Sequence, residues 1–273
     1  MDQWAKFVRL KALHQGDSAF VIPNPWDAGS ARLLASLGFE ALATTSAGYA
    51  FSKGKLDSFA SLGRDEVLEN AAEIVGAADL PVSADLEDGF GASPETCAET
   101  IRLACEIGLV GGSIEDATGN PAAPIYELSQ AVERIHAVAE AARGLPFLLT
   151  ARAENYLWER PDLDDTIERL QAFSAAGADV LYAPGLPDIE AIRTICAAVD
   201  KPVNVVMGLK GRKYSVAELS SVGVRRVSVG GSFARAALGA LMRAAMEFEY
   251  ADDALSAAFA SQLMSREKRQ DRL

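Results

Sequence analysis

The stretch AAGADVLYAPG, residues 175–185, contains one complete joint between a helix and a strand. Gly177 stands just past an amphipathic stretch, where a glycine supplies the left-handed conformation that ends a helix. The nearly continuous apolar run that follows predicts a strand buried on both faces. The same joint, a glycine followed by an apolar residue, recurs at Gly38-Phe39, Gly108-Leu109 and Gly223-Val224. This repetition indicates strands and helices in alternation.

Eight such strands and eight helices are expected along the chain. The strands are 20–23, 41–46, 81–86, 112–116, 147–152, 179–183, 202–207 and 226–230. The helices are 28–37, 65–78, 94–107, 128–143, 163–176, 188–199, 215–222 and 232–250. Eight units in about 250 residues favour an α/β fold of the TIM (β/α)8 barrel type over an open doubly wound sheet, and no GxGxxG motif follows the first strand. We therefore expect residues 1–273 to form a single barrel domain.

Two helical stretches lie outside this count. Residues 3–15 are expected to form a helix that caps the bottom of the barrel. Residues 254–267, within a C-terminal arm at 251–273, have an apolar side and nothing left in the barrel to cover. This terminal helix either packs on its own subunit or is exchanged with a neighbouring subunit, and the pattern leaves both open.

Composition excludes several classes of protein. The 26 Lys and Arg residues against 38 Asp and Glu residues give a net charge of −12, and no stretch gathers the basic residues, so we expect no nucleic-acid or membrane partner. The N-terminus has no apolar segment typical of a secretory signal, and no run reaches the roughly 20 apolar residues of a membrane helix. The three cysteines form no CxxC pair and are interpreted as reduced core residues of a cytoplasmic protein.

Acidic residues gather where the expected strands end. The third strand ends in SADLEDGFG, with Asp85, Glu87 and Asp88, and the fourth ends in Glu115 and Asp116. The fifth ends in ARAE, with Arg152 and Glu154, and Asp57 lies in the loop after the second. Catalytic groups of this fold lie at the carboxyl ends of the strands.

So many acids at one barrel mouth would repel one another unless a positive charge offsets them. Mg²⁺ binds oxygen ligands and keeps several waters, so Asp85 is the expected direct ligand, with Glu87 and Glu115 holding metal-bound waters and Mn²⁺ as a substitute ion. Arg152 would bind a carboxylate or a phosphonate. The alternative is that the acids only form ion pairs with Arg152 across the rim.

Other catalytic arrangements find less support. No lysine stands at a strand end to form a Schiff base, and no GxSxG nucleophile motif occurs. Gly230-Gly231-Ser232 opens the last barrel helix and would either bind a phosphate or cap that helix. The loop at 117–128 is either a mobile lid or an ordinary surface loop.

The segments NPWDAGSARLLASLGFEALATTSAG, SADLEDGFG, SIED and TARAE, in this order, resemble the isocitrate lyase/phosphoenolpyruvate mutase superfamily over nearly the whole chain. The resemblance implies a barrel whose terminal helix is exchanged between subunits of a homotetramer. It implies a magnesium neighbourhood formed by Asp57, Asp85, Glu87 and Glu115. It also implies that a substrate carboxylate binds between Arg152 and the backbone N–H groups of Thr45, Ser46, Ala47 and Gly48.

One segment departs from the family pattern. Isocitrate and methylisocitrate lyases carry a KKCGH-type gate after the second acidic pair, whereas this chain reads ATGNPAAP and has no Cys, Lys or His there. Thr118 and Asn120 are the candidate gate contacts that remain. The departure argues against the usual lyase chemistry and leaves the hydrolase and decarboxylase branches open.

These observations predict an Mg²⁺-dependent lyase or decarboxylase that breaks a C–C bond next to the carbonyl or hydroxyl of a small 2-oxo- or 2-hydroxycarboxylate, through an enolate. One alternative is a phosphonopyruvate hydrolase or mutase that acts on a P–C bond. Others are a 2-oxoacid-binding protein with little turnover and a phosphate-binding barrel that uses Gly230-Gly231. Tyr49, Tyr182 and Thr118 are all candidates for the proton donor.

Overall fold

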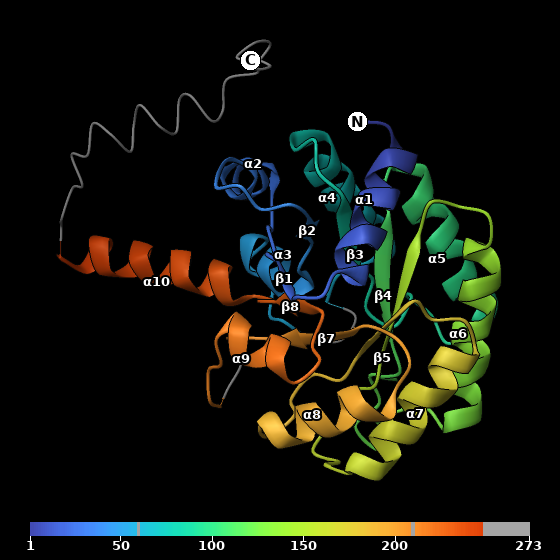
Figure 1. The fold of residues 1–273 in the computed structure, drawn as a ribbon. Coiled ribbons are helices and arrows are strands. Elements are labelled where there is room, and N and C mark those ends of the chain that lie inside the picture. Colours follow the sequence, from blue (N-terminus) through green and yellow to red (C-terminus); the bar gives the residue numbers. More distant parts are fainter. Residues whose placement is uncertain (59–60, 209–210, 248–273) are drawn as a thin grey trace.

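The computed structural model describes residues 1–58, 61–208 and 211–247 and contains one sheet of eight parallel strands (Figure 1). The hydrogen-bonded order is β1-β8-β7-β6-β5-β4-β3-β2, which is the order of a barrel unrolled between its first two strands. The strands are β1 (Phe20–Ile22), β2 (Leu42–Ala43), β3 (Val82–Asp85), β4 (Gly111–Glu115), β5 (Leu148–Arg152), β6 (Val180–Tyr182), β7 (Val203–Val206) and β8 (Arg226–Ser228). The TIM-barrel prediction is confirmed.

Helices follow the strands and surround the sheet in Figure 1. They are α1 (Gln3–Gln15), α2 (Ala28–Ser36), α3 (Ser46–Ser52), α4 (Arg64–Ala77), α5 (Pro94–Glu106), α6 (Leu128–Ala142), α7 (Leu163–Ala175), α8 (Ile189–Ala198), α9 (Val216–Ser221) and α10 (Ser232–Glu247). Each expected strand and helix within the described residues is present. Their apolar faces form the main core between sheet and helices, where Ile74, Ile101 and Phe173 are fully buried.

The two ends of the sheet meet through hydrogen bonds just beyond β1. The Ala43 N–H of β2 donates to the Pro23 carbonyl at 3.0 Å. The side-chain amide of Asn24 donates to the Thr44 carbonyl at 2.9 Å. Asn24 also accepts from the Val229 and Gly230 N–H groups, so it connects the ends of β1, β2 and β8.

The short helix α3 was not expected from the sequence, which predicted a strand as far as residue 46 and then a turn. The strand β2 ends at Ala43 because Thr45 caps a helix, with its hydroxyl oxygen accepting from the Gly48 N–H at 3.2 Å. Ser, Thr, Asp and Asn are the residues that favour this capping role. The segment 45–48 therefore enters the site as a helix start.

The helix α1 packs against residues near the starts of several strands, and its role as a cap of the barrel bottom stays a prediction. Leu10 is buried in a small cluster with Ile22, Ala41, Val110 and Leu148. One turn later, His14 is also buried, with Nδ1 2.8 Å from the Leu10 carbonyl and Nε2 3.5 Å from Nη1 of Arg226. A carbonyl only accepts, so Nδ1 carries the ring proton and Nε2 faces the guanidinium as an acceptor. Burial and the Arg226 charge together lower the pKa of His14 to about 3.

The last described helix, α10, extends away from the barrel in Figure 1. Leu241, Met242 and Met246 on this helix are more than half exposed. The expected helix at 254–267 and its exchange between subunits lie outside the described residues. Among the helices of the described ranges, none combines the length and apolar character that crossing a bilayer requires.

Replacing His14 should flatten the acid side of the pH–stability profile. In the unfolded chain His14 gains a proton near pH 6.5, whereas in the folded chain it stays neutral down to about pH 3, so stability falls as the pH drops through this window. Relative to His14→Gln, the wild type should lose up to about 1 kcal/mol of unfolding free energy per pH unit between pH 6 and 4, measured by urea denaturation. The exposed His136, changed to Gln, is the control. Parallel profiles for the wild type and His14→Gln would contradict this placement.

Candidate active site

A cavity of about 410 Å³ opens at the carboxyl ends of the strands. Most of the residues predicted for the site line it, namely Thr45, Ser46, Ala47, Asp57, Asp85, Glu87, Glu115 and Arg152. Gly48 lies just outside the lining, close to Thr45 and Trp26. Thr118 and Asn120 also lie outside it, in the loop after β4. Eight predicted residues thus converge on one cavity.

Arg152, the last residue of β5, holds three carboxylates. Its Nη1 lies 2.9 Å from Oδ1 of Asp85, and its Nη2 lies 3.1 Å from Oε2 of Glu115. Glu154 Oε1 accepts from Nε at 2.9 Å and also lies 2.9 Å from Nη2. The parallel register pairs Glu115 directly with Arg152, so neighbouring strands deliver these groups to one point. The acids therefore form ion pairs with Arg152, which was the alternative to a metal site that the sequence left open.

One guanidinium cannot neutralise three largely buried carboxylates. Burial and the neighbouring acids raise the pKa of Glu115 well above its usual range, although Arg152 acts in the opposite direction. Burial likewise raises the pKa of Glu154. Like charges at this spacing cannot all ionise unless further positive charge arrives. The cluster therefore either retains a proton or accepts another cation.

Glu87 adds to this excess of negative charge. Burial, followed by the charges of Asp85, Asp88 and Asp57, raises the pKa of Glu87 to about 8. Its backbone is left-handed, with φ 47°, a conformation that non-glycine residues rarely adopt. This conformation lets adjacent residues of the motif diverge, so that Glu87 lines the cavity while Asp88 turns toward α6.

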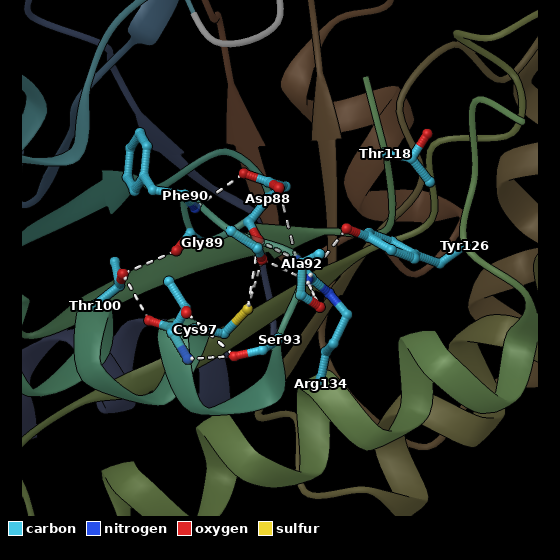
Figure 2. A network of polar contacts seen from close by, with 12 residues as sticks. Asp88, Gly89, Phe90, Ala92, Ser93, Cys97, Thr100, Thr118, Tyr126 and Arg134 are labelled. Carbon is cyan, nitrogen blue, oxygen red and sulfur yellow. Dashed lines mark hydrogen bonds and ion pairs between the residues drawn. The ribbon is translucent and has the colours of Figure 1, made fainter. Parts of the chain in front are cut away.

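Figure 2 shows that Arg134 of α6 holds the far side of this acidic loop. Its guanidinium donates to the Gly91 carbonyl at 2.6 Å and the Ala92 carbonyl at 2.8 Å, and also to the Asp88 carbonyl. The Asp88 carboxylate lies 3.9 Å away, and the guanidinium stacks 4.3 Å above the Tyr126 ring. Arg134 is only 2% exposed. It thus binds three backbone carbonyls of the loop that contains the left-handed residues Glu87 and Phe90.

Asp116 also turns away from the cavity, although Glu115 beside it faces inward. Its Oδ2 lies 3.1 Å from Nη1 of Arg169, and its Oδ1 accepts from the Glu154 N–H at 2.8 Å. Alternate residues of a strand face opposite sides, which separates the two acids. Asp116 thus supports the end of β5 from outside the barrel.

The amino end of α3 faces Asp85. The Ser46 hydroxyl donates to Oδ2 of Asp85 at 2.9 Å, and the Ser46 N–H lies 3.4 Å from the same oxygen. The Gly48 N–H is already bound to the Thr45 hydroxyl. Of the backbone donors expected here, the Thr45 and Ala47 N–H groups have no bond to a protein acceptor within the described residues.

The donor set suits a hard divalent cation. Asp85, Glu87 and Glu115 offer carboxylate oxygens, and the excess negative charge around them favours a dication. Within residues 1–58, 61–208 and 211–247, no three His, Cys, Asp or Glu side chains stand in a ready-made metal-binding arrangement. Mg²⁺ commonly uses one or two carboxylates and keeps its other ligands as water, so a single direct ligand such as Asp85 is sufficient.

The loop after β4 is closed by its own hydrogen bonds. Ala117 and Ile125 form an antiparallel bridge, and the Thr118 N–H donates to the Pro124 carbonyl at 2.8 Å. The Thr118 hydroxyl donates to the Ala123 carbonyl and accepts from the Asn120 N–H. The Asn120 side chain accepts from the Ala122 N–H at 3.0 Å. Both polar side chains therefore fold this loop, and their contact with a substrate stays a prediction.

The cavity also contains strand residues that the sequence interpretation missed. Ser83 and Ser113 line its inner wall, and they precede Asp85 and Glu115 by two positions. Since side chains two apart on a strand face the same way, this spacing was a usable signal. Deeper residues and rim residues also line it, namely Asn24, Trp158, Tyr182, Asn204, Arg226, Ser228 and Arg235.

The phosphoenolpyruvate phosphomutase family model matches residues 10–249. The chain belongs to the phosphoenolpyruvate mutase/isocitrate lyase superfamily. The family prediction is thereby confirmed. A solved structure from Burkholderia cenocepacia J2315, provisionally described as a lyase/mutase, is 60% identical, with a TM-score of 0.88 over 91% of this chain and 89% of the other.

Two curated relatives of this superfamily are named as lyases or decarboxylases. The oxaloacetate decarboxylase of Chromohalobacter salexigens is 28% identical over 94% of this chain and 89% of its own length. The 2-methylisocitrate lyase of Escherichia coli is 29% identical over 65% of this chain and 61% of its own length. Homologues of the chain are thus carbon–carbon lyases.

Removing the Arg134 guanidinium should destabilise the acidic loop. We expect Arg134→Met to lower the free energy of unfolding by about 3–5 kcal/mol, because buried carbonyls and Asp88 lose their charged donor. Urea denaturation followed by circular dichroism measures this loss. Arg143→Met, at the C-cap of the same helix and with a side chain that is 76% exposed, is the control and should change stability by less than about 0.5 kcal/mol. If Arg134→Met lowers the free energy of unfolding by less than about 1 kcal/mol, the acidic loop keeps its conformation without Arg134.

Proposed function

We propose that this protein is an Mg²⁺-dependent lyase of the decarboxylase type that breaks a C–C bond beside the carbonyl of a small 2-oxocarboxylate. The observation that carries the proposal is the cluster of Asp85, Glu115 and Glu154 around Arg152 inside the cavity. The name of the oxaloacetate decarboxylase relative supports the same class of substrate, and the 2-methylisocitrate lyase relative supports cleavage of a C–C bond.

Breaking the bond next to a carbonyl leaves an electron pair on carbon, which spreads to the carbonyl oxygen as an enolate. Positive charge and N–H donors placed at that oxygen lower the barrier. When bound, Mg²⁺ would supply Lewis-acid stabilisation of this negative charge, with Asp85 as direct ligand and Glu87 and Glu115 holding its waters.

The chain's own donors then orient the substrate. With Asp85 holding the ion, Nη1 of Arg152, which now pairs with Asp85, would donate to a substrate carboxylate. Ala47 lines the same cavity, so its N–H is the second donor that we expect there.

The proton that the enolate carbon needs afterwards has one well-placed source among the three candidates. Tyr182 lines the cavity, with the Arg152 guanidinium 5.0 Å from its ring centre. Tyr49 is buried outside the lining, and the Thr118 hydroxyl is bound within its loop. Burial raises the pKa of Tyr182, so it holds its proton at neutral pH.

The loop after β4 favours decarboxylation over retro-aldol cleavage. Cleavage of a hydroxy acid needs a base that removes the hydroxyl proton, whereas loss of CO₂ from a 2-oxo dicarboxylate does not. The segment 117–125 carries no Cys, Lys or His that would serve as this base.

Asp85 should be required for turnover. We expect Asp85→Asn, and the wild type in EDTA, to lose at least about a hundredfold in kcat/KM on the active member of a panel of 2-oxo, 2-hydroxy and phosphono acids. Pyruvate and CO₂ are measured as products, with and without Mg²⁺. Glu99→Gln, an exposed carboxylate on α5, is the control and should keep full activity.

Other products would overturn the proposal. Phosphate release from phosphonopyruvate would establish P–C chemistry instead. Saturable binding of 2-oxoacids with Mg²⁺ and no product over long incubation would establish a binding protein. Full activity of Asp85→Asn in EDTA would refute the metal assignment.

A homotetramer is also proposed. The exposed apolar residues Leu241, Met242 and Met246 on α10 give it support, because apolar surface of this kind favours contact with another chain. Light scattering should give four times the mass of one chain, and a monomer mass at micromolar concentration would contradict it.

A further inference from the structure

The interior of the barrel below the Arg152 cluster is polar. Barrels of this type are usually filled with Val, Ile and Leu. Here the inward-facing side chains include Ser83, Ser113, Thr150, Asn204, Arg226 and Ser228, each less than 10% exposed. The cavity reaches down to Arg226, Asn204 and Ser228. It therefore has a polar floor as well as a catalytic mouth.

Arg226 is the charged group of this floor, and only 6% of its surface is exposed. No carboxylate lies within ion-pair distance of it in the described part of the chain. Its contacts are neutral: Nε donates to Oδ1 of Asn204 at 2.8 Å and Nη2 to Oγ1 of Thr150 at 3.1 Å. Removing an unpaired guanidinium from water costs several kcal/mol.

The directions of the hydrogen bonds leave one further donor at the floor. Asn204 donates through Nδ2 to Oγ of Ser228 at 3.1 Å, which leaves the Ser228 hydroxyl proton free to donate. Thr150 lies outside the cavity lining and accepts from Arg226, and His14 is fixed as an acceptor below the guanidinium. A cation and the Ser228 hydroxyl thus lie at the floor with no acceptor of full negative charge.

We propose that the floor of the cavity is a binding site for a small monoanion held by Arg226 and Ser228. Such an anion only accepts hydrogen bonds, which is what a cation and a hydroxyl donor require. This chemistry is shared by a free halide and by one carboxylate of a substrate that reaches down from the Arg152 cluster. The site does not depend on turnover, so it stands or falls separately from the proposed reaction.

Halide binding is tested by thermal unfolding of the full chain. Chloride at ten times its dissociation constant should raise the Tm by about 3–6 °C over sodium gluconate at equal ionic strength. The rise should disappear in Arg226→Met and shrink in Ser228→Ala. Arg225→Met, the neighbouring arginine outside the cavity lining, should keep it.

A second measurement needs no substitution. Crystals of the wild type soaked in bromide should show an anomalous peak beside the Arg226 guanidinium. This keeps the test valid if Arg226→Met fails to fold.

Competition identifies the source of the anion. If a substrate carboxylate uses the floor, chloride should weaken calorimetric binding of 2-oxoglutarate at least tenfold and leave pyruvate binding unchanged. If only a halide uses it, chloride should leave both unchanged while the Tm rise and the bromide peak remain. Two results together would overturn the proposal. The first is the absence of a bromide peak beside Arg226. The second is that wild type and Ser228→Ala show the same Tm rise in chloride and the same affinity for 2-oxoglutarate.

Discussion

The bonding of three carboxylates to the single guanidinium of Arg152 is the constraint on which the site depends. Adjacent parallel strands place Asp85, Glu115 and Arg152 at the same edge of the barrel, and Glu154 follows two residues later. The cluster keeps more negative than positive charge, and burial makes that excess costly. A proton on Glu115 or an added dication relieves it, and the second solution is the one that supports enolate chemistry.

The rest of the local structure holds this cluster in place. Arg134 fixes the loop that carries Glu87, Arg169 fixes Asp116 at the base of the next loop, and Ser46 fixes Asp85 from the start of α3. Each contact comes from a helix that packs outside the barrel. Burying an acid beside other acids is possible because these supports are rigid and are themselves buried.

The barrel and most of the site could be predicted from the sequence, since glycine joints and apolar runs depend on local preferences. Residues at the carboxyl ends of the strands lie at the same end of the barrel whatever the details of packing. The sequence could therefore predict that Asp85, Glu115 and Arg152 lie close together. The divergent directions of Glu87 and Asp88 could not be predicted, because they depend on a left-handed backbone that Arg134 holds from a distant helix. The helix α3 was not predicted, because residues 41–46 resemble a strand although Thr45 caps a helix there. Arg226 was not predicted as a site residue, because it stands in a stretch that resembles an apolar strand.

The central claim is that the Arg152 cluster accepts a divalent cation together with a 2-oxocarboxylate. Mn²⁺ titration followed by water-proton relaxation tests this directly, with oxalate as an unreactive ligand. The account predicts one saturable Mn²⁺ site per chain, bound at least tenfold more tightly with oxalate, with this coupling lost in Arg152→Lys. Absence of saturable Mn²⁺ binding, or binding that oxalate does not change, would contradict it.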